Sequence, residues 1–143
     1  VGGPPERPKG RGRPDQVQAN PRTRKRVLLA PAAARFAAPG ALAALDQPIL
    51  IGAAALDTLT PPAEAKLVRK ATAPGQTRLQ IIPGAGHFSF LSPFPAALDR
   101  PGFAPALDPP GFDRLALQEP MQQAIRQFLQ IRMPIPSDAL TRL

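Results

Sequence analysis

Three short apolar runs stand out in the pattern of hydrophobic and polar positions along the chain. They cover residues 26–31, 48–52 and 77–83, and each ends at a proline or a glycine. Runs of this length and composition predict β-strands. The first two are almost continuously apolar, which is typical of strands that are covered on both faces of a parallel sheet.

The segment between the second and third runs has helical periodicity. Within residues 61–73, apolar side chains recur at positions that share one helical face. We expect Thr60 to cap this helix, Pro61 to take its first position and Glu64 to lie in its first turn, where a carboxylate complements the helix dipole. A strand, a helix and a second strand in this order predict an α/β fold with about three parallel strands and flanking helices.

The last third of the chain is predicted to be a long loop followed by one helix. Residues 92–112 contain six prolines, which exclude a regular helix there. The final helix is predicted to begin at Asp113 or Pro120 and to end near Arg132. Its buried stripe is expected to consist of Met121, Ala124, Ile125, Phe128 and Leu129. Asp113 is expected to act as a helix cap, and Arg114 is expected to be a surface charge.

The composition excludes several kinds of site. The chain of 143 residues has no cysteine and one histidine, so disulfides and thiolate nucleophiles are excluded and a conventional zinc site is disfavoured. No apolar stretch approaches the roughly 20 residues that a membrane span requires. We therefore predict no cofactor, no metal centre and no membrane span.

The net charge of +8 is concentrated near the amino terminus, where residues 1–26 carry eight basic and two acidic side chains. Residues 1–21 are rich in Pro, Gly and Arg without hydrophobic periodicity, which predicts a disordered basic tail. Either this tail is a solvated linker, or it binds polyanions weakly through its charge. We expect a folded domain over residues 22–133 and a second tail over residues 134–143.

Two polar residues follow predicted strands at equivalent places. Asp57 comes after the second apolar run, and His87 comes after the third. Because the carboxyl ends of neighbouring parallel strands meet at one edge of a sheet, these loops can bring the carboxylate onto the imidazole. A carboxylate that accepts from Nδ1 leaves Nε2 free to take a proton from a nucleophile. The alternatives are a turn residue for Asp57 and an imidazole satisfied by backbone groups for His87.

Four segments together resemble a known family. They are RVLLAPAAARF, PILIGAAALDTLTPP, IIPGAGHFSFLSP and DPPGFDRLAL. They resemble the carboxyl-terminal half of the predicted dienelactone hydrolases of the α/β-hydrolase superfamily, which are related to platelet-activating-factor acetylhydrolases. The resemblance implies the carboxyl-terminal part of an α/β-hydrolase fold, with Asp57 as the triad acid, His87 as the triad base and a small ester or lactone as the substrate.

The chain departs from this family in its nucleophile and its cysteines. It has no G-x-S-x-G elbow, and its serines, Ser89, Ser92 and Ser137, have other contexts. The family commonly has cysteines near the positions of Phe94 and Ala106, and here we expect Phe94 to pack on Ala106 instead.

These departures lead to two hypotheses about the function. We expect a carboxyl-terminal fragment or truncated relative of a serine hydrolase, inactive alone, whose incomplete sheet favours self-association or a partner chain. The alternative is a non-catalytic basic interaction protein that retains part of a hydrolase scaffold.

Overall fold

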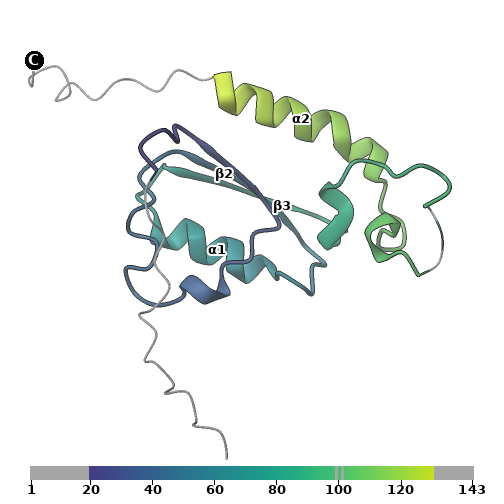
Figure 1. Cartoon of the computed structure of the whole chain (residues 1–143), viewed down its shortest axis with the longest axis horizontal. Coiled ribbons are helices and arrows are strands. Elements are labelled where there is room, and N and C mark those ends of the chain that lie inside the picture. The colour runs from purple at the N-terminus through teal and green to yellow at the C-terminus, as the bar shows by residue number, and fades with distance from the viewer. Residues whose placement is uncertain (1–19, 99, 101, 131–143) are drawn as a thin grey trace, which may run out of the picture.

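Three parallel strands form the sheet at the centre of the molecule. The computed structural model describes residues 20–98, 100 and 102–130. The strands are β1 (Arg26–Leu29), β2 (Ile49–Ala54) and β3 (Thr77–Ile82), and they lie side by side in the order β1-β2-β3 (Figure 1). The three predicted strands and their parallel arrangement are confirmed. The predicted tails fall almost wholly outside the described residues.

Strand β2 occupies the middle of the sheet because its sequence is apolar at nearly every position. All six of its residues are buried, whereas β1 and β3 carry exposed residues as well. Ile51 pairs with Leu28 on one side and with Leu79 on the other. A strand with apolar side chains on both faces is stable only where both faces are covered, and here two helices supply the cover.

Helix α1 (Pro62–Ala71) covers one face of the sheet. It lies against β2 and β3, and its residues Ala65 and Val68 pack with Ile49 and Ile51. The segment between β1 and β2 completes this core. From this segment, Ala33, Leu42 and Leu45 belong to the core cluster.

The start of α1 differs from the prediction by one residue. Pro61 has ψ 152°, so it is extended and serves as the N-cap position, while Pro62 is the first helical residue. The reason is steric, because a residue that precedes a proline is disfavoured in the helical region. The Thr60 hydroxyl does not cap the helix, and its actual contacts are described below.

Helix α2 (Arg114–Gln130) covers the other face of the sheet together with the 3₁₀ helix η2 (His87–Phe90) (Figure 1). Asp113 caps α2, since its Oδ1 accepts a hydrogen bond from the Ala116 N–H at 3.0 Å. Pro120 lies inside the helix and does not begin it. In the predicted stripe only Phe128 is fully buried, and the prediction for Leu129, which is 53% exposed, was wrong.

The packing of α2 on the sheet leaves space. A cavity of about 150 Å³ lies between them, lined by apolar residues from both layers that include Leu50, Phe90 and Met121. The loop before α2 contains one short 3₁₀ helix, η3 (Ala104–Ala106). Within residues 20–98, 100 and 102–130, no helix has the length and apolar character that crossing a membrane requires.

Candidate active site at the carboxyl ends of the strands

The loops after β2 and β3 run together past the ends of their strands. The Ala55 N–H donates to the Ile82 carbonyl at 3.0 Å, and the Leu56 N–H donates to the Ala85 carbonyl at 2.9 Å. Gly84 has φ 71°, a left-handed conformation that glycine adopts without a steric cost, and it turns the chain after β3. These contacts bring the residues after β2 alongside η2, which begins at His87.

Asp57 and His87, the two residues singled out in the sequence, are in direct contact. His87 Nδ1 lies 2.8 Å from Asp57 Oδ2. The side chain of Asp57 is completely buried, and that of His87 is 27% exposed. The buried carboxylate is therefore placed where it can orient the partly exposed imidazole.

The backbone that follows Asp57 holds its carboxylate in place. Oδ1 accepts hydrogen bonds from the N–H groups of Leu59 at 2.9 Å and Thr60 at 2.8 Å. Asp57 is thus both a turn residue and a partner of His87, so the two interpretations of this residue are compatible. A turn of this kind is a common use of Asp, whose side chain bonds the backbone a few residues onward.

The pKa of Asp57 reflects two opposing effects. Burial acts to raise its pKa, but the Thr60 N–H, the His87 ring, the Thr60 hydroxyl and the Leu59 N–H all stabilise the charged form. The hydrogen bonds outweigh the burial, and the pKa of Asp57 lies below its ordinary value of 3.8. The carboxylate is therefore ionised at neutral pH and accepts from His87.

His87 has one occupied and one open ring nitrogen. Nδ1 contacts Asp57 and Thr60, whereas Nε2 has no hydrogen bond within the part of the chain that the structure describes. An imidazole in this state can accept a proton at Nε2 from a group that lies within hydrogen-bond reach of this nitrogen.

Thr60 is a member of this site that the sequence analysis missed. Its Oγ1 lies 2.9 Å from Asp57 Oδ2, 3.1 Å from His87 Nδ1 and 3.1 Å from the carbonyl of Ala30, which follows β1. The motif DTLTPP predicted only a helix cap at Thr60. No local pattern marks a hydroxyl that contacts segments following all three strands.

Ser89 lies two positions after His87, but its hydroxyl is held elsewhere. The residue is 1% exposed, and its Oγ donates to Asp108 Oδ1 at 2.6 Å and accepts from the Gly86 N–H at 3.0 Å. This buried hydroxyl has two partners, and it connects η2 to Asp108. Ser89 lacks the elbow context of a hydrolase nucleophile, and its hydroxyl is bonded to Asp108 and Gly86.

Arg114 was expected on the surface, and that prediction was wrong. It is 6% exposed, and its guanidinium binds both oxygens of Asp108, with Nε 2.9 Å from Oδ2 and the Nη2 atom 3.1 Å from Oδ1. A third nitrogen of Arg114 donates to the Pro105 carbonyl at 2.9 Å. Bidentate geometry of this kind is the strongest form of an Arg–carboxylate pair. The network connects η2, the proline-rich loop and the start of α2.

Phe94 also packs against this network. Its ring meets Phe103 edge to face at 5.2 Å, and the Arg114 guanidinium lies 5.8 Å from the ring centre. Phe94 and Ala106 line one cavity together with Asp108 and Arg114. The loop is therefore held by a charged and aromatic cluster that the sequence analysis did not foresee.

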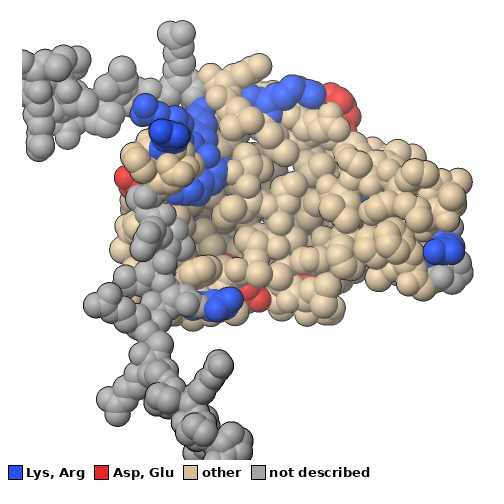
Figure 2. All heavy atoms as spheres, in the orientation of Figure 1, with Lys and Arg blue, Asp and Glu red and all other residues tan. Residues whose placement is uncertain are grey.

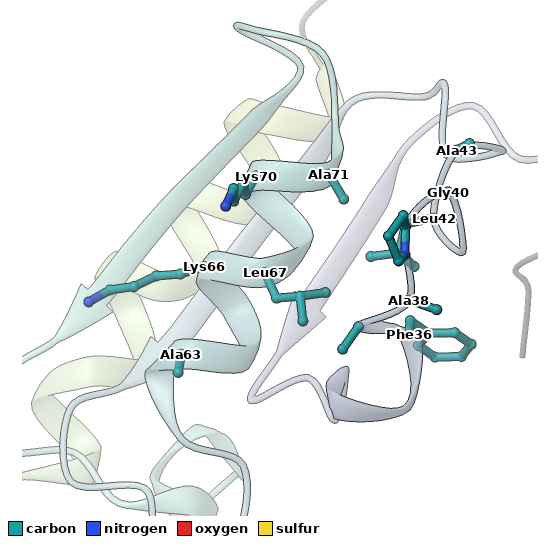
Figure 3. A pocket seen from close by; sticks show the side chains of 12 residues that line it. Phe36, Ala38, Gly40, Leu42, Ala43, Ala63, Lys66, Leu67, Lys70 and Ala71 are labelled. Carbon is teal, nitrogen blue, oxygen red and sulfur yellow. The ribbon is translucent and has the colours of Figure 1, made fainter. Parts of the chain in front are cut away.

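A larger cavity lies away from the Asp57–His87 pair. It measures about 570 Å³ and lies between α1 and residues 36–43 (Figure 3). Its walls are mainly apolar, and Figure 3 shows the Lys66 side chain reaching away from residues 36–43. Neither Asp57 nor His87 lines it, so its residues do not belong to the site described above. Within the described part of the chain, no three His, Asp or Glu side chains group as a metal site would require.

Comparison of the chain with protein-family models, with curated proteins and with solved structures finds no match. What is shown is a small α/β fold with a three-stranded parallel sheet and a carboxylate–imidazole pair at one edge.

Proposed function

We propose that this chain carries the acid and the base of a serine hydrolase that acts on ester or lactone bonds, within part of an α/β-hydrolase fold. The observation that supports this proposal is the contact of 2.8 Å between the buried Asp57 carboxylate and the partly exposed His87 ring. The order of acid and base along the chain is the order found in α/β-hydrolases. The nucleophilic serine and the oxyanion hole would come from polypeptide outside this chain.

The proposed mechanism assigns each proton to an atom. The serine hydroxyl attacks the substrate carbonyl and gives its proton to His87 Nε2, while Asp57 stabilises the imidazolium through Nδ1. The carbon–oxygen bond to the leaving group breaks, and Nε2 delivers the proton to the departing oxygen. Water then attacks the acyl-enzyme and gives its proton to Nε2. The bond between the acyl carbon and the serine oxygen breaks, Nε2 returns the proton to that oxygen, and the carboxylic acid product leaves.

The surroundings of the pair suit a substrate with apolar parts. Leu56 and Leu59 flank Asp57 in the chain, and they are 57% and 62% exposed. Exposed leucines at the edge that carries the acid and the base are suited to contact an acyl group or a lactone ring.

The decisive experiment uses the longest open reading frame that contains this chain. Its product is expected to carry an upstream G-x-S-x-G elbow, to react with a fluorophosphonate probe at that serine and to hydrolyse p-nitrophenyl esters. Asp57→Asn and His87→Gln should each lower kcat by roughly 10⁴-fold, the scale on which triad members act. Asp46→Asn, which lies outside the site, is the matched control and should leave kcat unchanged.

Two results would refute the proposal. One is a reading frame without an upstream elbow whose product shows no turnover. The other is a product that hydrolyses esters equally well with and without His87. The chain alone should show no labelling by the probe, and labelling that disappears in Ser89→Ala would show that Ser89 is a nucleophile after all.

A second candidate function has one observation in its favour. Figure 2 shows Lys and Arg side chains gathered at the upper left. Among the basic residues at the end where the strands begin, Arg24 and Arg78 are exposed; Arg24 lies two residues before β1, and Arg78 is the second residue of β3. This end of the sheet is opposite the Asp57–His87 pair. Polyanion binding there would weaken steeply with salt and would fall in Arg24→Ser with Arg78→Ser, whereas His87→Gln would leave it unchanged.

A further inference from the structure

Thr60 occupies the point where the ends of the three strands converge. Its hydroxyl oxygen contacts Ala30 after β1, Asp57 after β2 and His87 after β3, at 3.1, 2.9 and 3.1 Å. Both ends of the contact between Asp57 and His87 are therefore within reach of the same oxygen atom. A hydroxyl supplies one proton and two acceptor sites, so its contacts are not equivalent.

The proton of Thr60 has a restricted choice of partner. The Ala30 carbonyl can only accept a hydrogen bond, and so can the ionised Asp57 carboxylate. The low pKa of Asp57 keeps that carboxylate ionised at neutral pH. If Thr60 instead donated its proton to His87 Nδ1, Nδ1 would have to carry a lone pair and no proton. That lone pair would then face the lone pairs of Asp57 Oδ2 at 2.8 Å, which is repulsive. The Thr60 proton therefore goes to Ala30 or Asp57, and toward His87 the Thr60 oxygen is an acceptor.

We propose that Thr60 is a positioning residue for His87. The Thr60 hydroxyl oxygen is a second hydrogen-bond acceptor for the proton on Nδ1. It therefore holds the neutral ring as the Nδ1–H tautomer, in which Nε2 is free to take a proton. Asp57 and Thr60 then act together, because one carboxylate oxygen and one hydroxyl oxygen share the Nδ1 proton. The anchor to Ala30 keeps the hydroxyl at this place. A catalytic role for Nε2 rests on the proposed function. The assignment of the ring proton to Nδ1 does not rest on it.

The single histidine makes this inference directly measurable. Long-range ¹H–¹⁵N correlation spectra of ¹⁵N-labelled protein at mildly alkaline pH report which nitrogen of His87 carries the proton. The wild-type chain is expected to show the Nδ1–H form. In Thr60→Val, which keeps the side-chain shape and removes the hydroxyl, the share of the Nε2–H form should rise about fivefold, which corresponds to a hydrogen bond of about 1 kcal/mol.

Two further variants separate positioning from general destabilisation. Thr60→Ser retains the hydroxyl and should retain the wild-type tautomer. Thr72→Val removes a hydroxyl at the other end of α1, where Thr72 Oγ1 donates to the Arg69 carbonyl at 3.1 Å, and it should leave the tautomer unchanged. Thr60→Ala provides the same measurement if the valine variant does not fold.

The proposal is overturned by a wild-type spectrum dominated by the Nε2–H form, which needs no variant to observe. It is also overturned by a folded Thr60→Val or Thr60→Ala protein with the wild-type ratio of tautomers, or by an equal change in Thr72→Val. A positive tautomer result combined with no hydrolysis by the longer reading frame would refute the proposed function and leave the role of Thr60 intact. Hydrolysis by the longer reading frame combined with a negative tautomer result would refute the role of Thr60 and leave the proposed function intact.

Discussion

Replacement of Asp108 with asparagine would remove the charge at the centre of the network that holds the proline-rich loop. Asp108 accepts hydrogen bonds from Ser89 at 2.6 Å and from Arg114 at 2.9 and 3.1 Å. Asparagine has the same size but no charge, so the Arg114 guanidinium would remain buried without a counter-ion. Breaking a buried ion pair from one side costs about 3–5 kcal/mol.

The structure places the expected cost at the lower end of that range. The Asp108 side chain is 17% exposed, and the Pro105 carbonyl still accepts from Arg114 after the substitution. We therefore expect Asp108→Asn to lower the free energy of unfolding by about 3 kcal/mol. Small domains have a total stability of only about 5–15 kcal/mol, so this is a large fraction.

The chain contains a matched control for this prediction. Arg126 and Glu119 also form an ion pair at 2.9 Å, but their side chains are 53% and 76% exposed. Glu119→Gln breaks this pair in solvent and should cost less than about 1 kcal/mol. The two variants make the same chemical change at the same separation, but the Asp108 carboxylate is more buried and also accepts from Ser89 and from a second nitrogen of Arg114.

Urea unfolding followed by circular dichroism is the suitable assay, because the chain has no Trp or Tyr to report by fluorescence. Ser89→Ala supplies an intermediate point, since it removes one donor to Asp108 and leaves the charge pair in place. A cost for Asp108→Asn that lies within about 1 kcal/mol of the cost for Glu119→Gln would refute the reasoning, since burial would then have little effect on the pair.

Two further predictions concern Asp57 and Gly52. Because the pKa of Asp57 is lower in the folded state than its ordinary value of 3.8, its contribution to stability is present above about pH 4 and is lost as the pH falls through the folded pKa. The free energy of unfolding should therefore fall with acidification more steeply in the wild-type chain than in Asp57→Asn, and equal slopes in urea titrations would contradict this. At Gly52 in β2, an added Cβ would lie 3.0 Å from Leu29 Cδ2 and 3.1 Å from Phe90 Cε1, so Gly52→Ala should destabilise the fold by about 1–3 kcal/mol. Thermal unfolding checks this, and the double variant with Leu29→Ala should recover part of the loss if the close approach to Leu29 is the cause.

Local patterns along the chain were enough to predict the three strands and the two α-helices, but not the 3₁₀ helix η2 that carries His87. The apolar runs predicted β1, β2 and β3, and the helical spacing predicted α1 and α2, because each pattern follows from the geometry of one element. The positions of Asp57 and His87 were predicted for a related reason. Both follow strands that a connecting helix makes parallel, so both belong to the same edge of the sheet. The cap at Asp113 could also be predicted, since a cap depends on neighbours a few residues away.

Tertiary structure alone decided the contacts between segments that are distant in the chain. Arg114 is buried because Asp108 and the Pro105 carbonyl converge on it, and nothing in its own neighbourhood marks it as different from a surface arginine. Thr60 has the sequence context of a helix cap, yet its hydroxyl contacts Ala30, Asp57 and His87. Leu129 has the helical spacing of a core residue but is 53% exposed, although its neighbour Phe128 is buried. In each case the state of the side chain depends on which groups surround it in space, and local periodicity carries no information about those groups.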